Sequence, residues 1–229
     1  MNLCVIPARG GSKRIPRKNI RPFRGMPMIS WSINTAIKSE CFDRIIVSTD
    51  DKEISEVAQS YGAEVPFLRP KSLADDYTVT RDVIEHAINQ SSLLGIAYKA
   101  VCCLYATAPF VQPKHLKQAL TMLFESNTAT TVFPATTFPY PIQQALRLDS
   151  NGYCSSIDTS NANKRSQDLE EAFHDSGQFY WASPATWCIE SNMFDGGRPL
   201  IIPRWLVNDI DTEEDWIRAE LMHKTLFSD

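Results

Sequence analysis

Residues 3–19, with the sequence LCVIPARGGSKRIPRKN, join an apolar strand directly to a loop that contains glycines and a cluster of cations. Gly10 and Gly11 allow the backbone to approach phosphate oxygens, and Pro16 stiffens the path of the loop. The cations available to neutralise a polyphosphate are Arg9, Lys13, Arg14 and Lys18. Because backbone amides and positive charge together bind phosphate, this stretch predicts nucleotide chemistry at the end of a strand.

The charge of the chain is distributed unevenly. The formal net charge is −4, yet residues 1–39 contain eight lysines and arginines and no aspartate or glutamate. A basic corner on an acidic protein indicates a local anionic ligand, whereas a nucleic-acid surface normally shows a broad basic face. The alternative is a solvated basic loop without a ligand.

Several classes of protein lack support in the sequence. The first loop has neither the GxxxxGK[ST] pattern of P-loop hydrolases nor the GxGxxG pattern of dinucleotide-binding proteins. The six cysteines form no CxxC pair, so neither a zinc site nor a disulfide framework is expected. No apolar run approaches the roughly 20 residues that span a bilayer, and no signal sequence follows Met1. We therefore expect a cytoplasmic protein that contacts no membrane.

Strand-like and helix-like patterns alternate over the first 135 residues. After the first strand, strands are expected at 44–50, 63–70, 99–110 and 129–135. Helices are expected at 27–39, 51–62, 80–91 and 114–126, the third of them capped by Thr80. This order predicts an α/β fold with a doubly wound, mostly parallel sheet, in which the polar strand ends converge on one crevice.

The alternation is lost at about residues 138–176, which are polar and have no strong helical period. A long irregular stretch is unusual in a compact domain, so we expect a lid, a hairpin or a subunit contact. Regular structure resumes with a strand at 178–183, a short helix, an apolar run at 199–207 and a helix from Thr212. We therefore predict a single domain over residues 1–229 with this excursion inserted.

Asp209 and Asp211 lie two residues apart on an extended segment just before the last helix. This spacing puts both carboxylates on one side of the chain, where they could hold Mg²⁺ against a polyphosphate. The alternative is a charged helix start, and we assign Thr212 and Asp215 to such a cap. Asp50 and Asp51 are competing candidates for this role; we expect Asp51 to cap another helix and Asp50 to face the site.

Together these motifs resemble the nucleotide-sugar cytidylyltransferases that activate nine-carbon 2-keto sugar acids. IPARGGSKRIPRKN is similar to the CTP-binding loop of that family, VSTDD and FLRPKSLADD to the next strand ends, and DIDTEEDW to the metal-bearing segment. Sialic acid synthetases have a Gln-Pro-Thr-Ser-Pro type sequence after the fourth strand, where this chain has residues 105–109, YATAP. That form, with FHDSGQFYW at 173–181, resembles the pseudaminic acid cytidylyltransferase branch.

The resemblance implies a nucleotide-diphospho-sugar transferase-like, Rossmann-like fold and assigns roles to individual residues. For catalysis it implies Arg9, Lys18, Asp209 and Asp211, the two aspartates holding Mg²⁺. For CTP it implies Ala8, Arg9, Gly10, Gly11, Ser12, Lys13, Lys18, Asn19, Arg69, Tyr105 and Thr107. For the sugar acid it implies Arg165, Gln167, Gln178 and Tyr180. Within the strand at 178–183, alternation puts Phe179 and Trp181 on one face and Gln178 and Tyr180 on the other.

The implied reaction transfers CMP from CTP, the co-substrate, to the anomeric hydroxyl of pseudaminic acid and releases pyrophosphate. The resemblance also implies a homodimer in which the excursion reaches the neighbouring subunit. One alternative is a CMP-N-acetylneuraminate (sialic acid) synthetase, and a non-enzymatic alternative is a nucleotide-binding regulatory module. Nucleic-acid binding is disfavoured because the rest of the chain is acidic and the basic loop lacks interleaved aromatic residues.

Overall fold

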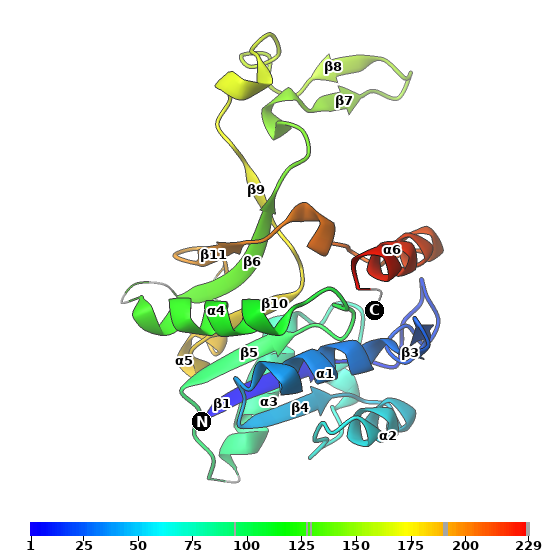
Figure 1. Ribbon diagram of the computed structural model, residues 1–229, viewed down its shortest axis with the longest axis vertical. Helices are drawn as coiled ribbons and strands as arrows, with labels where there is room; N and C mark the ends of the chain where they lie inside the picture. Colours follow the sequence, from blue (N-terminus) through cyan, green and yellow to red (C-terminus); the bar gives the residue numbers. More distant parts are fainter. Residues whose placement is uncertain (94, 127, 129, 190–191, 228–229) are drawn as a thin grey trace.

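The computed structural model describes residues 1–93, 95–126, 128, 130–189 and 192–227. Within them, a central sheet has the strand order β11-β6-β10-β5-β1-β4, with β9 also paired to β6 (Figure 1). Its strands are β1 (Asn2–Pro7), β4 (Arg44–Ser48), β5 (Ala100–Leu104), β6 (Thr131–Thr137), β9 (Phe173–Asp175), β10 (Phe179–Ala182) and β11 (Arg198–Ile201).

The sheet is mixed but mostly parallel through its centre. β1 runs parallel to both β4 and β5, and β11 runs parallel to β6. β10 is inserted antiparallel between β5 and β6, and β9 is antiparallel to β6. The predicted α/β architecture is confirmed, and the two antiparallel strands are β9, at the end of the excursion, and β10, directly after it.

Helices cover both faces of the sheet because the central strands are apolar on both sides. In β1, Cys4 and Ile6 join a core cluster with α1 (Met28–Ser39), α2 (Lys52–Ser60) and α4 (Pro113–Glu125). The alternate residues Leu3 and Val5 join a second cluster with α3 (Thr80–Ser92) and α5 (Pro184–Trp187). Because helices cover both faces of the sheet, the polar loops at the strand ends remain accessible to a ligand.

A third core cluster joins the C-terminal helix to the segment after the first loop. α6 (Glu213–Leu226) packs Trp216 and His223 against Phe23, which lies in a small ribbon of β2 (Pro22–Phe23) and β3 (Met26–Pro27). Thr212 caps α6 in a capping box with Asp215, as predicted. This packing holds the segment containing Asp211 against the basic loop.

The excursion, residues 138–176, projects away from the sheet (Figure 1). It carries a separate two-stranded ribbon of β7 (Leu146–Leu148) and β8 (Cys154–Ser156). Short 3₁₀ turns lie at Ile142–Gln144 and Ser166–Asp168, and others in the chain lie at Lys71–Leu73 and Arg204–Leu206. Among the described residues, no helix is both long and apolar enough to cross a membrane.

Two local predictions were wrong. The strand expected at 63–70 is reduced to a single bridge between Ile46 and Glu64, and the chain then leaves the sheet. Thr80 does not cap α3, whose N-cap is Val79 without a side-chain bond; the Thr80 hydroxyl instead bonds the Tyr105 hydroxyl at 2.8 Å. Residue 129 of the strand predicted at 129–135 lies outside the described residues.

Candidate active site

A pocket of about 470 Å³ opens where β1 ends. Most of its lining comes from the first loop, with further residues from the ends of other segments. The lining residues are Pro7, Arg9, Ser12, Lys13, Arg14, Lys18, Asn19, Asp76, Thr107 and Asp211. The structure thus brings together in one pocket several of the predicted site residues: Arg9, Ser12, Lys13, Lys18, Asn19, Thr107 and Asp211.

The first loop is held in place by its own contacts with the body. Ile15 is fully buried in the third core cluster, which anchors the middle of the loop. The Asn19 side-chain amide donates to the Arg9 carbonyl at 2.9 Å and so ties the end of the loop to its beginning. Four cations of the anchored loop, Arg9, Lys13, Arg14 and Lys18, line the pocket.

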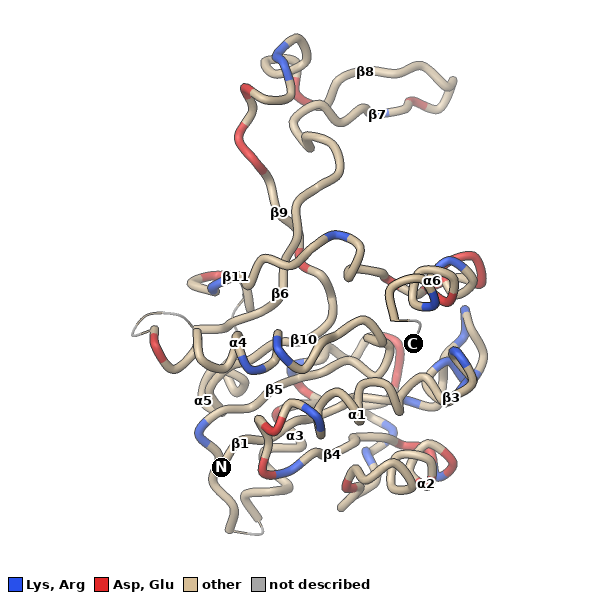
Figure 2. Tube along the Cα trace, in the orientation of Figure 1, with Lys and Arg blue, Asp and Glu red and all other residues tan. Residues whose placement is uncertain are grey.

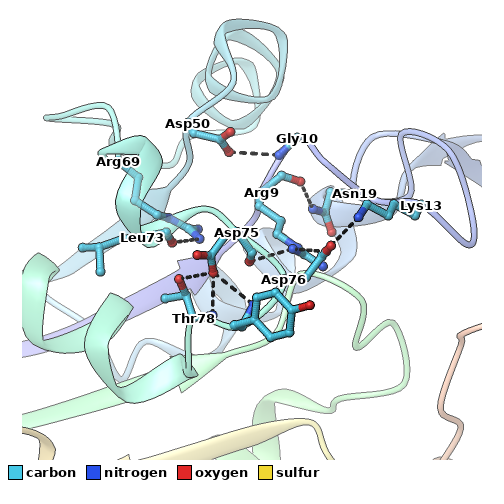
Figure 3. Close-up of polar contacts among 11 residues, drawn as sticks. Arg9, Gly10, Lys13, Asn19, Asp50, Arg69, Leu73, Asp75, Asp76 and Thr78 are labelled. Atoms are coloured by element: carbon cyan, nitrogen blue, oxygen red, sulfur yellow. Dashed lines mark hydrogen bonds and ion pairs between the residues drawn. The ribbon is translucent and has the colours of Figure 1, made fainter.

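The structure shows a packing reason for glycine at position 10. A Cβ at this position would lie 2.7 Å from the Asp51 carboxylate, so glycine is needed where the loop passes α2. The Gly10 amide already donates to Asp50 at 3.0 Å (Figure 3). Nothing lies within 4 Å of a Cβ built on Gly11, so close packing does not explain that glycine. Ala8 is buried, and its amide donates to the Ser48 carbonyl.

Figure 2 shows the basic residues near β3, with acidic residues on α2 and α6 on either side of them. Asp51 caps α2, as predicted, by accepting from the Ile54 amide. It also accepts two bonds from the Arg17 guanidinium, at 2.6 and 3.0 Å. The Arg17 bonds lower the pKa of Asp51 to about 2, so this carboxylate is charged at neutral pH. The pair fixes the outer side of the loop.

A second, smaller pocket of about 210 Å³ shares Arg9 and Asp76 with the first and also contains Arg69 and Tyr105. Arg69 is 6% exposed and donates to the Ser48 and Leu73 carbonyls. Burial lowers the pKa of its guanidinium to about 10, so it remains charged at neutral pH. Within the described residues it forms no ion pair, so the second pocket contains a buried cation that is held by hydroxyl and carbonyl oxygens.

The two predicted metal ligands differ in their surroundings. Asp211 lines the main pocket, where Arg14 and Lys18 contact it at 2.8 and 3.3 Å. Asp209 is separated from Asp211 by the buried Ile210, is exposed, and is not part of the pocket lining. The described residues contain no cluster of three or more His, Cys, Asp or Glu side chains that could hold a metal. Oxygen donors of this kind still fit Mg²⁺, which typically binds one or two carboxylates and completes its shell with substrate phosphates and water.

The four residues predicted for the sugar acid are not gathered in one place. Arg165 and Gln167 lie on the excursion, where Arg165 pairs with Asp168 at 2.8 Å. Gln178 is buried and donates to the Leu206 carbonyl, and the Tyr180 hydroxyl donates to Asp175. The predicted faces of β10 are confirmed: Phe179 and Trp181 belong to one core cluster and Tyr180 to the other.

Asp76 is a pocket residue that the sequence predictions did not assign. It accepts from Arg9 at 2.7 Å and from Lys13 at 2.5 Å, and Figure 3 shows its carboxylate between them. The available signal was the acidic pair in FLRPKSLADD, a segment already expected at a strand end of the site. Its pairing with cations more than 60 residues earlier depends on the fold.

A family model described as Cytidylyltransferase matches residues 3–185. The chain belongs to the cytidylyltransferase family. This cytidylyltransferase is 46% identical over 224 residues to pseudaminic acid cytidylyltransferase of Campylobacter jejuni subsp. jejuni serotype O:2, covering 97% of this chain and 96% of that protein. It is 35% identical to CMP-N,N'-diacetyllegionaminic acid synthase of Legionella pneumophila, covering 95% and 94% of the two chains.

Solved structures support the fold of this cytidylyltransferase. CMP:2-keto-3-deoxy-manno-octonic acid synthetase, solved in complex with CTP, superposes with a TM-score of 0.72 over 98% of this chain and 99% of that chain. The sequence identity is 16%, so this likeness concerns the fold alone. It confirms the predicted nucleotide-diphospho-sugar transferase-like architecture.

Proposed function

We propose that this protein transfers CMP from CTP to pseudaminic acid, giving CMP-pseudaminic acid and pyrophosphate. The observation that carries the proposal is the pocket at the end of β1, where four cations of one loop lie together with Asp76 and Asp211. This pocket suits a triphosphate, and the near full-length similarity to pseudaminic acid cytidylyltransferase indicates the acceptor. Because the reaction consumes CTP, we place it in the cytoplasm.

The proposed chemistry is one displacement at phosphorus. The anomeric hydroxyl oxygen forms a bond to the α-phosphorus of CTP and its proton passes to water, while the bond from that phosphorus to the bridging oxygen breaks and pyrophosphate leaves. Arg9, Lys13 and Lys18 stabilise the charge on the departing pyrophosphate. Asp209 and Asp211 hold Mg²⁺, which when bound neutralises phosphate charge and favours ionisation of the attacking hydroxyl. Catalysis therefore depends on positioning and charge neutralisation.

The remaining nucleotide contacts are assigned to the two adjoining pockets. The loop residues take the triphosphate, and the second pocket, with Arg69 and Tyr105, takes the nucleoside. Thr107 lies at the end of β5, where it borders the triphosphate pocket. We assign the amides of Gly10 and Gly11 to the phosphates, which for Gly10 requires its amide to exchange Asp50 for phosphate. The Ala8 amide is bonded to the Ser48 carbonyl, so Ala8 contributes to nucleotide binding by placing the start of the loop.

The sugar acid is bound by groups from two chains of a homodimer. Gln178 and Tyr180 contribute from the subunit that binds CTP. Arg165 and Gln167 are exposed on the projecting excursion, where the Arg165 guanidinium can reach the sugar carboxylate of a neighbouring subunit. The chain thus acts as one catalytic domain with an excursion used for association.

A panel of pyrophosphate-release assays tests the function. CTP is compared with the other nucleoside triphosphates, and pseudaminic acid with N-acetylneuraminic and N,N'-diacetyllegionaminic acids. We expect turnover to require CTP and to be fastest with pseudaminic acid. Faster turnover with N-acetylneuraminic acid would reassign the protein to the sialic acid synthetases, and CTP binding without turnover of any sugar would indicate a regulatory module.

Replacing Asp211 by alanine tests the metal assignment. We expect turnover in Mg²⁺ to fall by about a thousandfold, because a metal contributes several kcal/mol of transition-state stabilisation. Glu214→Ala, which removes an exposed acid from the start of α6, is the matched control and should retain near-native activity. An Asp211→Ala protein with native far-UV circular dichroism and near-native activity would contradict the assignment.

A further inference from the structure

Every lysine and arginine that lines the main pocket is already paired with a carboxylate of the same chain. Asp76 takes Arg9 and Lys13, at 2.7 and 2.5 Å. Asp211 takes the other two cations, Arg14 and Lys18, at 2.8 and 3.3 Å. Each carboxylate therefore neutralises two cations, and a triphosphate has to compete with both for its binding partners.

Asp76 is presented to the pocket by the short segment that precedes α3. Its neighbour Asp75 accepts from the Tyr77 and Thr78 amides, at 3.0 and 2.7 Å, and so forms a tight turn. The Arg9 guanidinium donates to the Asp75 carbonyl as well as to the Asp76 carboxylate, both at 2.7 Å (Figure 3). Within the described residues, the Asp76 side chain bonds only to Arg9 and Lys13.

These ion pairs are suited to exchange. The Asp76 side chain is 37% exposed and that of Lys13 is 78% exposed, so water can replace either partner. Exposed ion pairs contribute little to stability, whereas a phosphate group offers stronger, charge-assisted bonds to the same cations. Displacement of Asp76 by phosphate is therefore favourable without any change in the core.

We propose that Asp76 is a built-in counter-anion of the triphosphate site, which CTP displaces and which then contributes to binding the divalent metal. Once phosphate oxygens take the four cations, Asp76 and Asp211 both remain in one pocket without positive partners. Their combined charge matches that of one divalent cation, and Mg²⁺ accepts carboxylate oxygens together with phosphates, directly or through water. Asp76 thus opposes CTP binding without metal and favours it with metal.

This exchange couples the two ligands. Thermodynamic linkage makes this coupling reciprocal. If Mg²⁺ increases the affinity for CTP by some factor, CTP increases the affinity for Mg²⁺ by the same factor. Removing the charge of Asp76 should improve the metal-free affinity and reduce the coupling. A purely structural role for Asp76 predicts the opposite for the metal-free protein, because a disordered loop binds CTP less well.

Calorimetric titration of CTP into the Asp76→Asn protein tests the proposal, once in EDTA and once in saturating Mg²⁺. In EDTA we expect the dissociation constant to fall about fivefold relative to the unsubstituted protein, and the gain in affinity from Mg²⁺ to shrink about tenfold. Glu53→Gln is the matched control: it removes an acid paired with Arg17, outside the pocket lining, and should change neither quantity. Thermal unfolding checks that both variants are folded.

The proposal rests on the proposed function, and the titrations separate the two. An unsubstituted protein that binds no CTP under either condition would overturn the function. An unsubstituted protein whose CTP binding is strengthened by Mg²⁺, together with an Asp76→Asn protein showing unchanged or weaker metal-free binding, would overturn the counter-anion role alone. If Mg²⁺ increases the affinity of Asp76→Asn for CTP as much as it does for the unsubstituted protein, Asp76 does not contribute to metal binding.

Discussion

The sheet body and the excursion differ in how they bury apolar side chains. In the body, Trp181 is fully buried and stacks on Phe42 with ring centroids 4.9 Å apart. In the excursion, Leu148 is 66% exposed and Tyr153 is 74% exposed. The body therefore contains its own core, whereas Leu148 and Tyr153 of the excursion are left largely uncovered by the described part of the chain. Exposed apolar groups gathered on a projecting segment favour contact with another molecule.

Aromatic truncations test this contrast most strongly. Trp181→Ala should lower the free energy of unfolding by about 3–5 kcal/mol, because it removes a large buried ring and leaves a cavity. Tyr153→Ala, the matched truncation in the excursion, should change it by less than about 0.5 kcal/mol. Urea denaturation of both variants, at protein concentrations low enough to favour the monomer, measures the difference. Equal losses would show that the two regions are stabilised alike.

The body was predictable where burial on both faces leaves continuous apolar runs. β1 and β5 follow this pattern and both were predicted, although β5 ends at Leu104 whereas the strand was expected to continue to residue 110. Glu64 lies where the next strand was expected, but only one bridge forms there, because Pro66 and Pro70 interrupt backbone pairing. The antiparallel direction of β10 was missed because the path of the excursion sets it, and no local pattern encodes that path.

The site was predictable in its cations but not in their partners. Glycines and cations next to a strand end identified the loop, and Asp211 was found from its spacing to Asp209. The pairing of Asp76 with Arg9 was not predictable, since it joins segments brought together only by the fold. The steric need for Gly10 beside Asp51 was missed for the same reason.

The pH dependence of stability is a second test of the sheet body, because the body contains a histidine that is buried in its neutral form. His223 lies among aromatic rings including Trp31 and Phe110, and burial, assisted by the charge of Arg24, lowers its pKa from 6.5 to about 4. The folded state thus binds this proton less readily than the unfolded state. The stabilisation is complete above pH 6.5 and is lost as the pH falls toward 4.

We expect His223 to account for about 2 kcal/mol of the stability lost between pH 8 and pH 5. Urea denaturation gives the free energy of unfolding of the unsubstituted and His223→Phe proteins at both pH values. The contribution of His223 is the decrease between pH 8 and pH 5 in the unsubstituted protein minus the decrease in His223→Phe. Phenylalanine keeps an aromatic ring in the cluster but has no group that titrates. If His223→Phe loses as much stability on acidification as the unsubstituted protein, the pH dependence arises elsewhere in the body.

The smallest effect on folding, and the most informative about the excursion, is expected from its exposed ribbon. Leu146 and Leu148 are 63% and 66% exposed on β7. Replacing both by serine should change monomer stability by no more than about 0.5 kcal/mol, since little buried area is lost. If the ribbon contacts a second copy, the same change removes apolar area from that interface and weakens association. Sedimentation velocity over a range of concentrations should then show a larger monomer fraction.

Leu221→Ser, at an equally exposed site on α6, is the body control and should leave association unchanged. A double variant that associates like the unsubstituted protein would show that the apolar side chains of β7 are not covered by a neighbouring subunit.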